Sequence, residues 1–383
     1  MKFLLNYSKS LLRKSTLPIL LMAGSALPMS AQVEMKSGYA FQLEKGLNCT
    51  AIKSQGNTGT CWSFATSSFL ESELLRIGKE PFDLSEMYVV RNIYKEKARN
   101  YVLRQGKANF SQGSLSHDVI NAAKKYGLVP ETAYSGKTDP DQKHNHGEMA
   151  AVLKGMLDGV LKQKRLSDKW MKVLDAAMDI YLGAAPEQFS YEGKTYDPKS
   201  FAKDNGINPD DYISLTSYTH HDFYDEFILE IPDNFSNGAF HNLPMDELMT
   251  VFDNAIKNGY SVAWDGDVSE KGFSSKEGMA VLPVDTKRKD LFEQPGKEVE
   301  VDQALRQRTF ESYATTDDHL MHLTGIAKDK KGTKYYLIKN SWGEIGPEKG
   351  YLYMSEAYAK LKTVAIMVHK DAVPKNILEK LDI

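Results

Sequence analysis

The sequence predicts an α+β protein with two lobes, in which a mainly helical first half is followed by a mainly β last third. Apolar residues recur at helical spacing in the first half, whereas short apolar runs separated by turn residues dominate the end of the chain. The 383 residues are 42% hydrophobic and 26% charged, which is typical of a globular protein with a substantial core.

The helical half begins after Cys61, where Ala65, Phe69 and Leu74 share one helical face and Gly78 supplies a stop. This spacing predicts a helix from Cys61 to Ile77. Further helices are expected at Ser116–Gly127, as two amphipathic segments within Glu148–Gly183 of which the second begins at Ser167, and at Pro244–Gly259. The segment near 140–235 therefore looks like a charged helical insertion.

The last third contains short apolar segments typical of strands. Strands are expected at Tyr260–Trp264, His322–Ala327, Tyr335–Lys339, Tyr351–Met354 and Val364–Val368. The turn Lys330-Lys331-Gly332 lies between two of these segments and predicts that they pair as a hairpin.

The N-terminus has the order of a secretory signal. Lys2, Lys9, Arg13 and Lys14 precede an apolar run from Leu17 to Leu27, and small residues follow at Ser30 and Ala31. We expect residues 1–32 to be a signal peptide, and residues 33–383 to form one domain that is exported to the periplasm or the exterior. The run is short for a membrane span, so no stable membrane association is expected after cleavage; a retained anchor is the alternative. The net charge of −3, without a long basic run, argues against a nucleic-acid partner.

The chain has two cysteines, Cys49 and Cys61, which an exported protein could join in a disulfide. Their surroundings favour two free thiols instead. A glycine-containing loop leads from Gln55 into a helix whose first residue is Cys61, and the dipole of that helix end favours a thiolate, the nucleophilic form. Gly59 keeps the approach to sulfur open. The Gln55 amide and the Cys61 N–H are candidate donors to an oxyanion.

A thiolate also needs a base, and we expect that base to be His322 at the start of an apolar strand. The next strand ends at Asn340, and the hairpin should bring its carbonyl beside the imidazole and fix the tautomer. Trp342 could shield this hydrogen bond from water. His319, in the polar segment Asp317-Asp318-His319, is the alternative base.

These residues resemble the papain-like cysteine peptidases, in which Gln, Cys, His and Asn occur in this order. The segments Gln55–Thr66 and Asn340-Ser341-Trp342-Gly343 fit the cysteine and asparagine motifs of that family. The chain is most similar to the bleomycin hydrolase and aminopeptidase C branch, through Leu84-Ser85-Glu86, Lys125–Pro130, Asp267-Val268 and Val373-Pro374. The similarity extends from about Gln55 to the C-terminus, apart from much of the insertion.

The resemblance implies a papain-like fold in which Cys61 is the nucleophile, His322 the acid–base, Asn340 the orienting residue and Gln55 the oxyanion donor. It further implies that Gly113 binds the substrate backbone, with Trp342 also in the substrate-binding site. No metal or organic cofactor is implied. Peptides are the expected substrates, and the branch commonly assembles into hexameric rings.

Aminopeptidase activity is the function that this branch implies. Members thread a longer C-terminal arm into the cleft, whereas here only Pro374 to Ile383 follow Val373, so an endopeptidase with an open cleft is an alternative. A non-catalytic peptide-binding protein on the same fold is the alternative from another class.

Two histidine pairs could suggest a metal site. His144 and His146 lie near Asp139, and His220-His221 precedes Asp222. Such spacing alone is weak evidence for metal binding, and both segments are expected to be solvated loops.

Overall fold

A computed structural model describes residues 38–383 of the chain. The predicted signal peptide, residues 1–32, lies outside the described residues. Among the described residues, no helix combines the length and the apolar character that crossing a bilayer requires.

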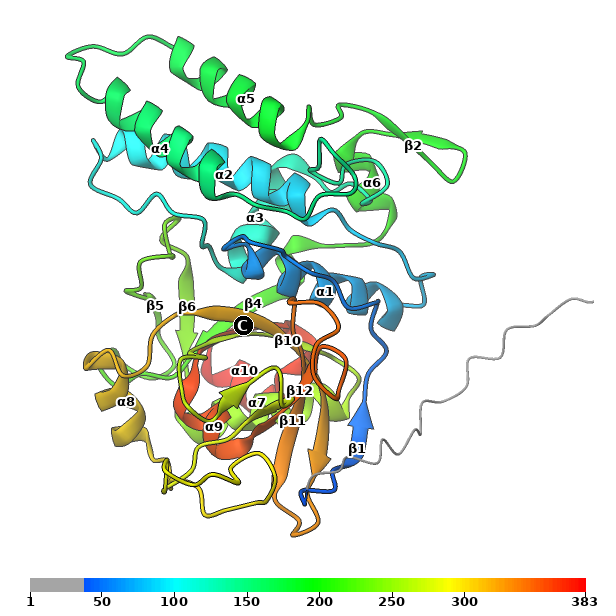
Figure 1. The fold of residues 1–383 in the computed structure, drawn as a ribbon, viewed down its shortest axis with the longest axis vertical. Helices are drawn as coiled ribbons and strands as arrows, with labels where there is room; N and C mark the ends of the chain where they lie inside the picture. The colour runs from blue at the N-terminus through cyan, green and yellow to red at the C-terminus, as the bar shows by residue number, and fades with distance from the viewer. Residues whose placement is uncertain (1–37) are drawn as a thin grey trace, which may run out of the picture. The chain divides into compact units, whose positions relative to one another are not determined.

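The helical lobe is built around one buried helix. The buried helix is α1 (Cys61–Arg76). The other helices of this lobe are α2 (Glu86–Leu103), α3 (Ser116–Tyr126), α4 (Gly147–Val160), α5 (Lys169–Leu182) and α6 (Pro198–Asp204). Every residue of α1 from Cys61 to Leu74 is buried, because α2 and α3 pack on one side of it and the sheet packs on the other (Figure 1). The helix that begins with Cys61 is therefore fixed along most of its length.

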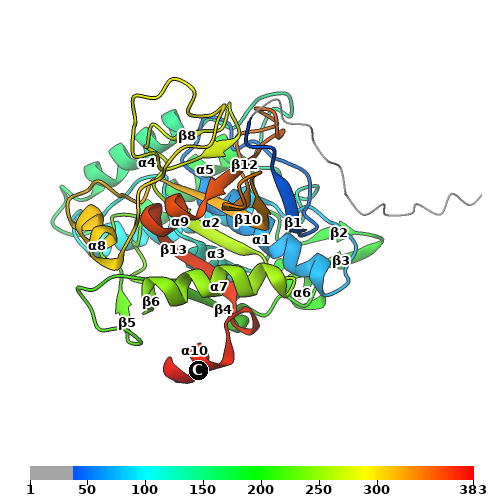
Figure 2. The ribbon, with the colours of Figure 1, turned by 90° about the horizontal axis from the view of Figure 1, so that it is seen from below.

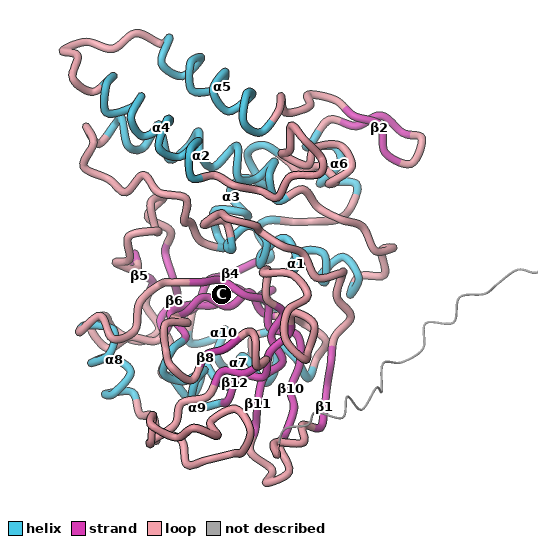
Figure 3. Tube along the Cα trace, viewed as in Figure 1, coloured by secondary structure: helices cyan, strands magenta, loops and turns pink. Residues whose placement is uncertain are grey.

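The β lobe is one eleven-stranded mixed sheet, in the order β5-β6-β4-β13-β7-β10-β11-β12-β9-β8, with β1 paired to β10. The strands are β1 (Gln42–Gly46), β4 (Tyr212–Thr216), β5 (Glu226–Ile228), β6 (Ala239–Asn242), β7 (Val262–Gly266), β8 (Phe273–Ser274), β9 (Met279–Ala280), β10 (His319–Lys328), β11 (Lys334–Lys339), β12 (Tyr351–Ser355) and β13 (Thr363–His369). A separate hairpin joins β2 (Phe189–Tyr191) to β3 (Lys194–Tyr196). Figure 3 shows the sheet curling below the helical lobe.

Helices also cover the face of the sheet that is turned away from α1. They are α7 (Met245–Lys257), α9 (Glu356–Lys362) and α10 (Lys375–Lys380), and Figure 2 shows α7 and α10 beneath the strands. Helix α8 (Gln303–Glu311) lies to one side of the sheet and packs against α9 (Figure 2). Short 3-10 turns occur at Pro209–Asp211 and Lys370–Ala372. The two faces of β10 belong to different hydrophobic clusters. Leu320 packs with Phe64 of α1, whereas Met321 packs with Phe252 of α7. Neighbouring residues of β10 therefore point into opposite lobes.

The α+β prediction is confirmed, and every helix and strand expected from the sequence is present within a few residues of its predicted bounds. One boundary differs in a way that matters, since β10 begins at His319 rather than at His322. The expected insertion contains α4, α5 and α6, but it also holds the β2–β3 hairpin and strands β4 and β5. Helix α2 was not among the predicted elements.

Candidate active site

The first residue of α1 is Cys61, and its thiol lies between this helix and β10. The residue is 8% exposed. The backbone N–H groups of Leu320 and Trp62 act to lower the pKa of the thiol. The preceding loop is tied to the segment around Gln112, because Gly59 N donates to Gln112 Oε1 at 2.8 Å and Trp62 Nε1 donates to the Gln112 carbonyl at 2.9 Å. Cys49 is also a free thiol, so the expectation of no disulfide is confirmed.

The imidazole of His319 forms the polar contact that the sequence analysis assigned to His322. Its Nε2 lies 2.7 Å from Asn340 Oδ1, and that oxygen also accepts from Ser341 N at 2.7 Å. Asn340 Nδ2 donates to Ser275 Oγ at 2.9 Å, which fixes the orientation of the amide. His319 Nε2 therefore carries the donated proton, and Nδ1 is the nitrogen with a free lone pair.

The predicted pairing of His322 with Asn340 is wrong. His322 lies directly opposite Lys339 in the β10–β11 ladder, and paired residues point to the same face of a sheet. Asn340, the next residue, therefore points the other way. His322 faces α1 instead, where its Nδ1 lies 2.9 Å from Ser68 Oγ, which in turn accepts from Lys339 Nζ at 2.7 Å. His322 is fully buried, and burial moves its pKa well below the ordinary range.

Two other expected site residues lie beside the His319–Asn340 pair. The Trp342 ring stacks on the His319 ring with centroids 4.6 Å apart, so it covers the imidazole as expected. Gln55 is anchored at its carbonyl oxygen, which accepts from Ser341 Oγ at 2.7 Å. Its Nε2 donates one hydrogen to the Thr58 carbonyl at 2.7 Å, which leaves the second hydrogen available to an oxyanion.

Burial favours the neutral form of both reactive groups. Burial raises the pKa of the Cys61 thiol to about 12, and the charges of Asp317 and Asp265 act in the same direction. Burial lowers the pKa of His319 to about 4, although its bond to Asn340 acts in the opposite direction. Burial therefore opposes the lowering of the thiol pKa that the helix end was expected to give. Transfer of the proton from sulfur to imidazole forms two opposite charges together, which costs less than burying either charge alone.

Gly113 lies in the segment that contacts the Cys61 loop, as the expected substrate-binding role requires. It is partly exposed, but the carboxylate of Asp233 lies directly over it. A Cβ atom at position 113 would lie 1.7 Å from Asp233 Oδ2. No sequence motif connects the loop around residue 233 to the Cys61 loop, so Asp233 was not among the expected site residues.

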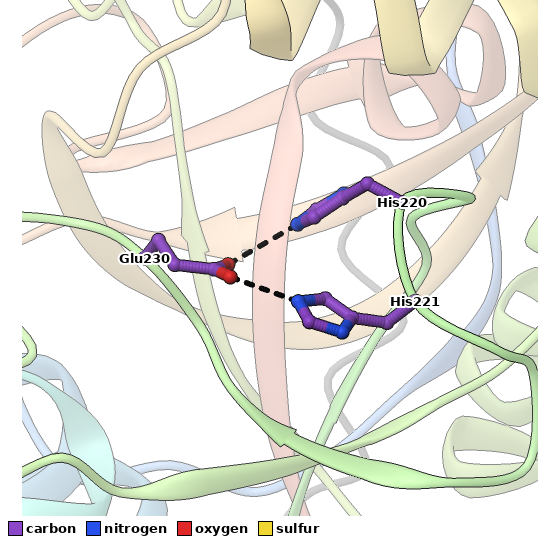
Figure 4. A group of neighbouring side chains, drawn as sticks. All are labelled: His220, His221 and Glu230. Atoms are coloured by element: carbon purple, nitrogen blue, oxygen red, sulfur yellow. Dashed lines mark hydrogen bonds and ion pairs between the residues drawn. The ribbon is translucent and has the colours of Figure 1, made fainter.

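A group of His220, His221 and Glu230 is close enough to hold a metal ion, but its hydrogen bonds do not suit one (Figure 4). The Nε2 atoms of the two rings lie 3.1 and 2.8 Å from different oxygens of Glu230. Gln307 fixes the His220 tautomer, since its Oε1 accepts from Thr219 N and its Nε2 donates to His220 Nδ1. His220 Nε2 therefore carries a hydrogen and lacks the lone pair that a metal would need.

The other acidic group with suitable spacing, Glu71, Asp83 and Glu86, already surrounds a cation. Lys53 Nζ lies 3.2 Å from Glu71 and 2.5 Å from Glu86, and it also contacts Asp83. His146 differs from the expected solvated loop, because it is 2% exposed at the start of α4. Within residues 38–383, His144 and His146 belong to no group of three side chains spaced to hold a metal ion.

The fold and the arrangement of Cys61, His319, Asn340 and Gln55 are those of a papain-like protein. Residues 101–383 match the Peptidase C1-like family, and the chain belongs to that family. Aminopeptidase G of Lactobacillus delbrueckii subsp. lactis is 25% identical over 86% of this chain and 83% of its own length. Aminopeptidase C of Listeria monocytogenes is 26% identical over 86% and 82%, and human bleomycin hydrolase is 23% identical over 86% and 82%.

Among solved structures, PepW of Lactobacillus rhamnosis superposes with a TM-score of 0.72 over 89% of this chain and 84% of that chain, at 20% identity. This superposition confirms the predicted papain-like fold.

Proposed function

We propose that the chain is a cysteine aminopeptidase in which Cys61 is the nucleophile and His319 the general acid–base. The observation that carries this proposal is the hydrogen bond from His319 Nε2 to Asn340 Oδ1 beneath the Trp342 ring, at the start of the strand β10 that packs against α1, the helix of Cys61. The similarity to proteins named aminopeptidase G and aminopeptidase C supports the choice of exopeptidase.

The reaction follows from these positions. The Cys61 proton moves to His319 Nδ1, and the thiolate attacks the carbonyl carbon of the scissile peptide bond. The resulting oxyanion accepts from the second Gln55 Nε2 hydrogen and from the Cys61 N–H at the start of α1. The amine leaves with the proton held by His319, which gives a thioester. Water attacks this thioester with His319 as base, and the N-terminal residue and the thiol are released.

Two fluorogenic substrates test the proposal, one with a free N-terminus and one with an acetylated N-terminus, under reducing conditions. We expect cleavage of the free-amine substrate, and loss of cleavage in Cys61→Ala. Faster turnover of the acetylated substrate would favour the endopeptidase alternative. Binding of peptide without cleavage of either substrate would favour the non-catalytic alternative.

Export and assembly are further parts of this proposal. The basic and apolar order of residues 1–32 supports export to the periplasm or the exterior. N-terminal sequencing of protein recovered from that compartment tests the cleavage near Ala31, and recovery with an intact N-terminus from membranes would favour the retained anchor. Resemblance to the bleomycin hydrolase branch supports a hexamer, and a single-chain mass in light scattering would contradict it.

A further inference from the structure

Asp233 places a carboxylate at the position where the substrate backbone is expected to bind. Its Oδ2 would lie 1.7 Å from a Cβ at position 113, so the carboxylate rests on the bare backbone of Gly113. Its Oδ1 accepts from Asn109 Nδ2 at 2.8 Å and from Ser111 Oγ at 3.0 Å. These two bonds hold the side chain in place and occupy one oxygen.

The loop that carries Asp233 is fixed at its beginning as well. Glu230 accepts from both His220 and His221, as described above (Figure 4). Asn234, the residue after Asp233, donates to the carbonyls of Leu229 and Gly238 at 3.0 Å each. The position of the Asp233 carboxylate is therefore set by the folded chain before any substrate binds.

Two further carboxyl groups interact electrostatically with both Asp233 and Cys61. Asp265 of β7 is directly opposite Leu320 of β10, whose backbone N–H lowers the pKa of the Cys61 thiol, and Asp317 shortly precedes β10. The charges of Asp265 and Asp317 raise the pKa of the Cys61 thiol. The charge of Asp233 in turn raises the pKa of Asp265 and of Asp317. We call Asp233, Asp265 and Asp317 the acidic group.

Polar atoms around the acidic group lack donors. The carboxyl group of Asp265, which is 4% exposed, is hydrogen-bonded to Asp317 and has no N–H donor among the described residues. Burial and the charge of Asp317 raise the pKa of Asp265 well above the ordinary range. The hydroxyl of Tyr218, a residue outside the acidic group, is fully buried and likewise has no partner in the described part of the chain. Burial raises the pKa of Tyr218, and the charges of Asp265 and Asp317 raise it further, so its hydroxyl shares their surroundings. Buried polar groups are almost always paired, so this region is suited to a ligand that brings hydrogen-bond donors.

The cations near the acidic group leave it short of positive charge. The charge of Lys97 lowers the pKa of Asp317, and the charge of Asp233 raises the pKa of Lys97. The Lys97 Nζ donates its hydrogen bond to the Gly113 carbonyl, however. Arg306 lies over the Tyr218 ring and donates to the Ser217 and Lys360 carbonyls. Lys97 is thus the lysine whose charge acts with Asp233 and Asp317, and Asp233 Oδ2 remains available beside the expected path of the substrate.

We propose that the acidic group, with Asp233 in front, binds the N-terminal ammonium of the substrate and so selects peptides with a free N-terminus. This inference rests on the proposed aminopeptidase function and adds the residues that would confer it. An ammonium has three N–H donors and one positive charge, which match the available Oδ2 and the negative charge of Asp233 over Gly113. The Asp233 side chain over Gly113 also obstructs a longer chain on that side of the scissile bond.

Asp233→Asn is the sharpest test, because the Asn carbonyl can still accept from Asn109 and Ser111 while the charge is lost. We expect KM for the free-amine substrate to rise about tenfold or more, with a smaller change in kcat. The acetylated substrate should be unaffected. The ratio of kcat/KM for free over acetylated substrate should therefore fall at least about tenfold. Asp168→Asn, on the exposed side before α5, is the matched control and should leave the ratio unchanged.

An unchanged ratio in Asp233→Asn, with cleavage of the free-amine substrate intact, would overturn this inference and leave the aminopeptidase proposal standing. A lysine side chain is the other source of an ammonium. The wild-type enzyme could prefer acetyl-lysine over acetyl-alanine substrates. If Asp233→Asn removes that preference and leaves the ratio for free over acetylated substrate unchanged, the acidic group binds a lysine side chain and the inference is wrong.

A binding measurement makes the test independent of turnover. Calorimetry compares a free-amine peptide with its acetylated form on Cys61→Ala and on Cys61→Ala with Asp233→Asn. We expect the free-amine peptide to lose about tenfold or more in affinity in the double variant, and the acetylated peptide to bind both alike. Equal affinity of the free-amine peptide for the two proteins would overturn the inference even if no substrate were cleaved.

Discussion

His319 and His322 lie three residues apart on the same strand, β10, yet their surroundings differ completely. His319, at the start of the strand, contacts Asn340 and stacks on Trp342. His322 is buried against α1, where it contacts Ser68 in a chain that ends at Lys339. An odd separation along a strand places two residues on opposite faces, so one histidine belongs to the site and the other to the lobe interface.

The largest expected effect separates the two histidines by activity. His319→Gln removes the base and should lower kcat by about 10²- to 10⁴-fold. His322→Gln is the matched control and should retain most of the activity at a temperature well below its unfolding midpoint. Steady-state kinetics on the free-amine substrate measures both. Comparable losses in the two variants would show that the roles are not divided as proposed.

The next comparison uses the neighbouring residues of β11. Asn340→Ala should lower kcat on the order of 10- to 100-fold, the range seen when the partner that orients a functional histidine is removed. Lys339→Met, on the opposite face, should leave kcat nearly unchanged because its ammonium contacts Ser68 and Thr50 rather than His319. A larger kinetic loss in Lys339→Met would contradict the assignment.

A third variant examines the buried side of the comparison. Ser68→Ala leaves His322 Nδ1 without its partner and removes one acceptor of Lys339, so the free energy of unfolding should fall by about 1–3 kcal/mol. Urea denaturation measures this change, and the kcat of the folded enzyme should stay within about twofold of wild type. A loss of activity without a loss of stability would connect His322 to catalysis.

The smallest expected effect per step of the measurement, the change for each pH unit, is one that the two histidines share. Burial lowers the pKa of both, to about 4 for His319, while the unfolded chain binds protons near pH 6.5. As pH falls below about 6.5, the unfolded state takes up the proton first, so each histidine destabilises the fold by about 1.4 kcal/mol per pH unit. For His319 this slope should end near pH 4, and for His322 it should continue lower.

The measurement is the difference in pH slope between wild type and each glutamine variant. Other groups also contribute to the total slope, since burial raises the pKa of Glu86 to about 8 and that of Glu131 to about 7. These carboxyl groups oppose the histidines in sign, but they cancel in the difference. An unchanged slope in both variants would mean that neither histidine is held neutral by the fold.

Much of the architecture could be predicted from the sequence, because helical spacing and strand-length apolar runs are local signals. The placement of Cys61 at the start of a helix followed from Gly59 and the apolar residues after it. His322 was preferred to His319 because the strand was expected to begin at His322, whereas it begins at His319. The polar residues Asp317 and Asp318 suggested a loop, whereas hydrogen bonds to β7 extend the strand back to His319.

The turn at Lys330-Lys331-Gly332 sets a register in which Lys328 pairs with Lys334, and without interruption that register would place His322 opposite Asn340. A register shift between Leu323 and Gly325 places His322 opposite Lys339 instead, so Asn340 faces the other side, with His319. The sequence carries no local signal for this irregularity. Asp233 and Asp265 could not be found from the sequence either. Their proximity to Gly113 and Leu320 depends on long-range packing, for which one sequence carries no local signal.

The contact between Gly113 and Asp233 also constrains how the sequence can change over time. Any side chain at position 113 meets the carboxylate within 1.7 Å, so Gly113→Ala is tolerated only after residue 233 has become smaller. The two positions should therefore covary among relatives, with substitution at 233 preceding substitution at 113. A lineage that loses Asp233 regains freedom at position 113, and with it room for a longer peptide on that side of the scissile bond.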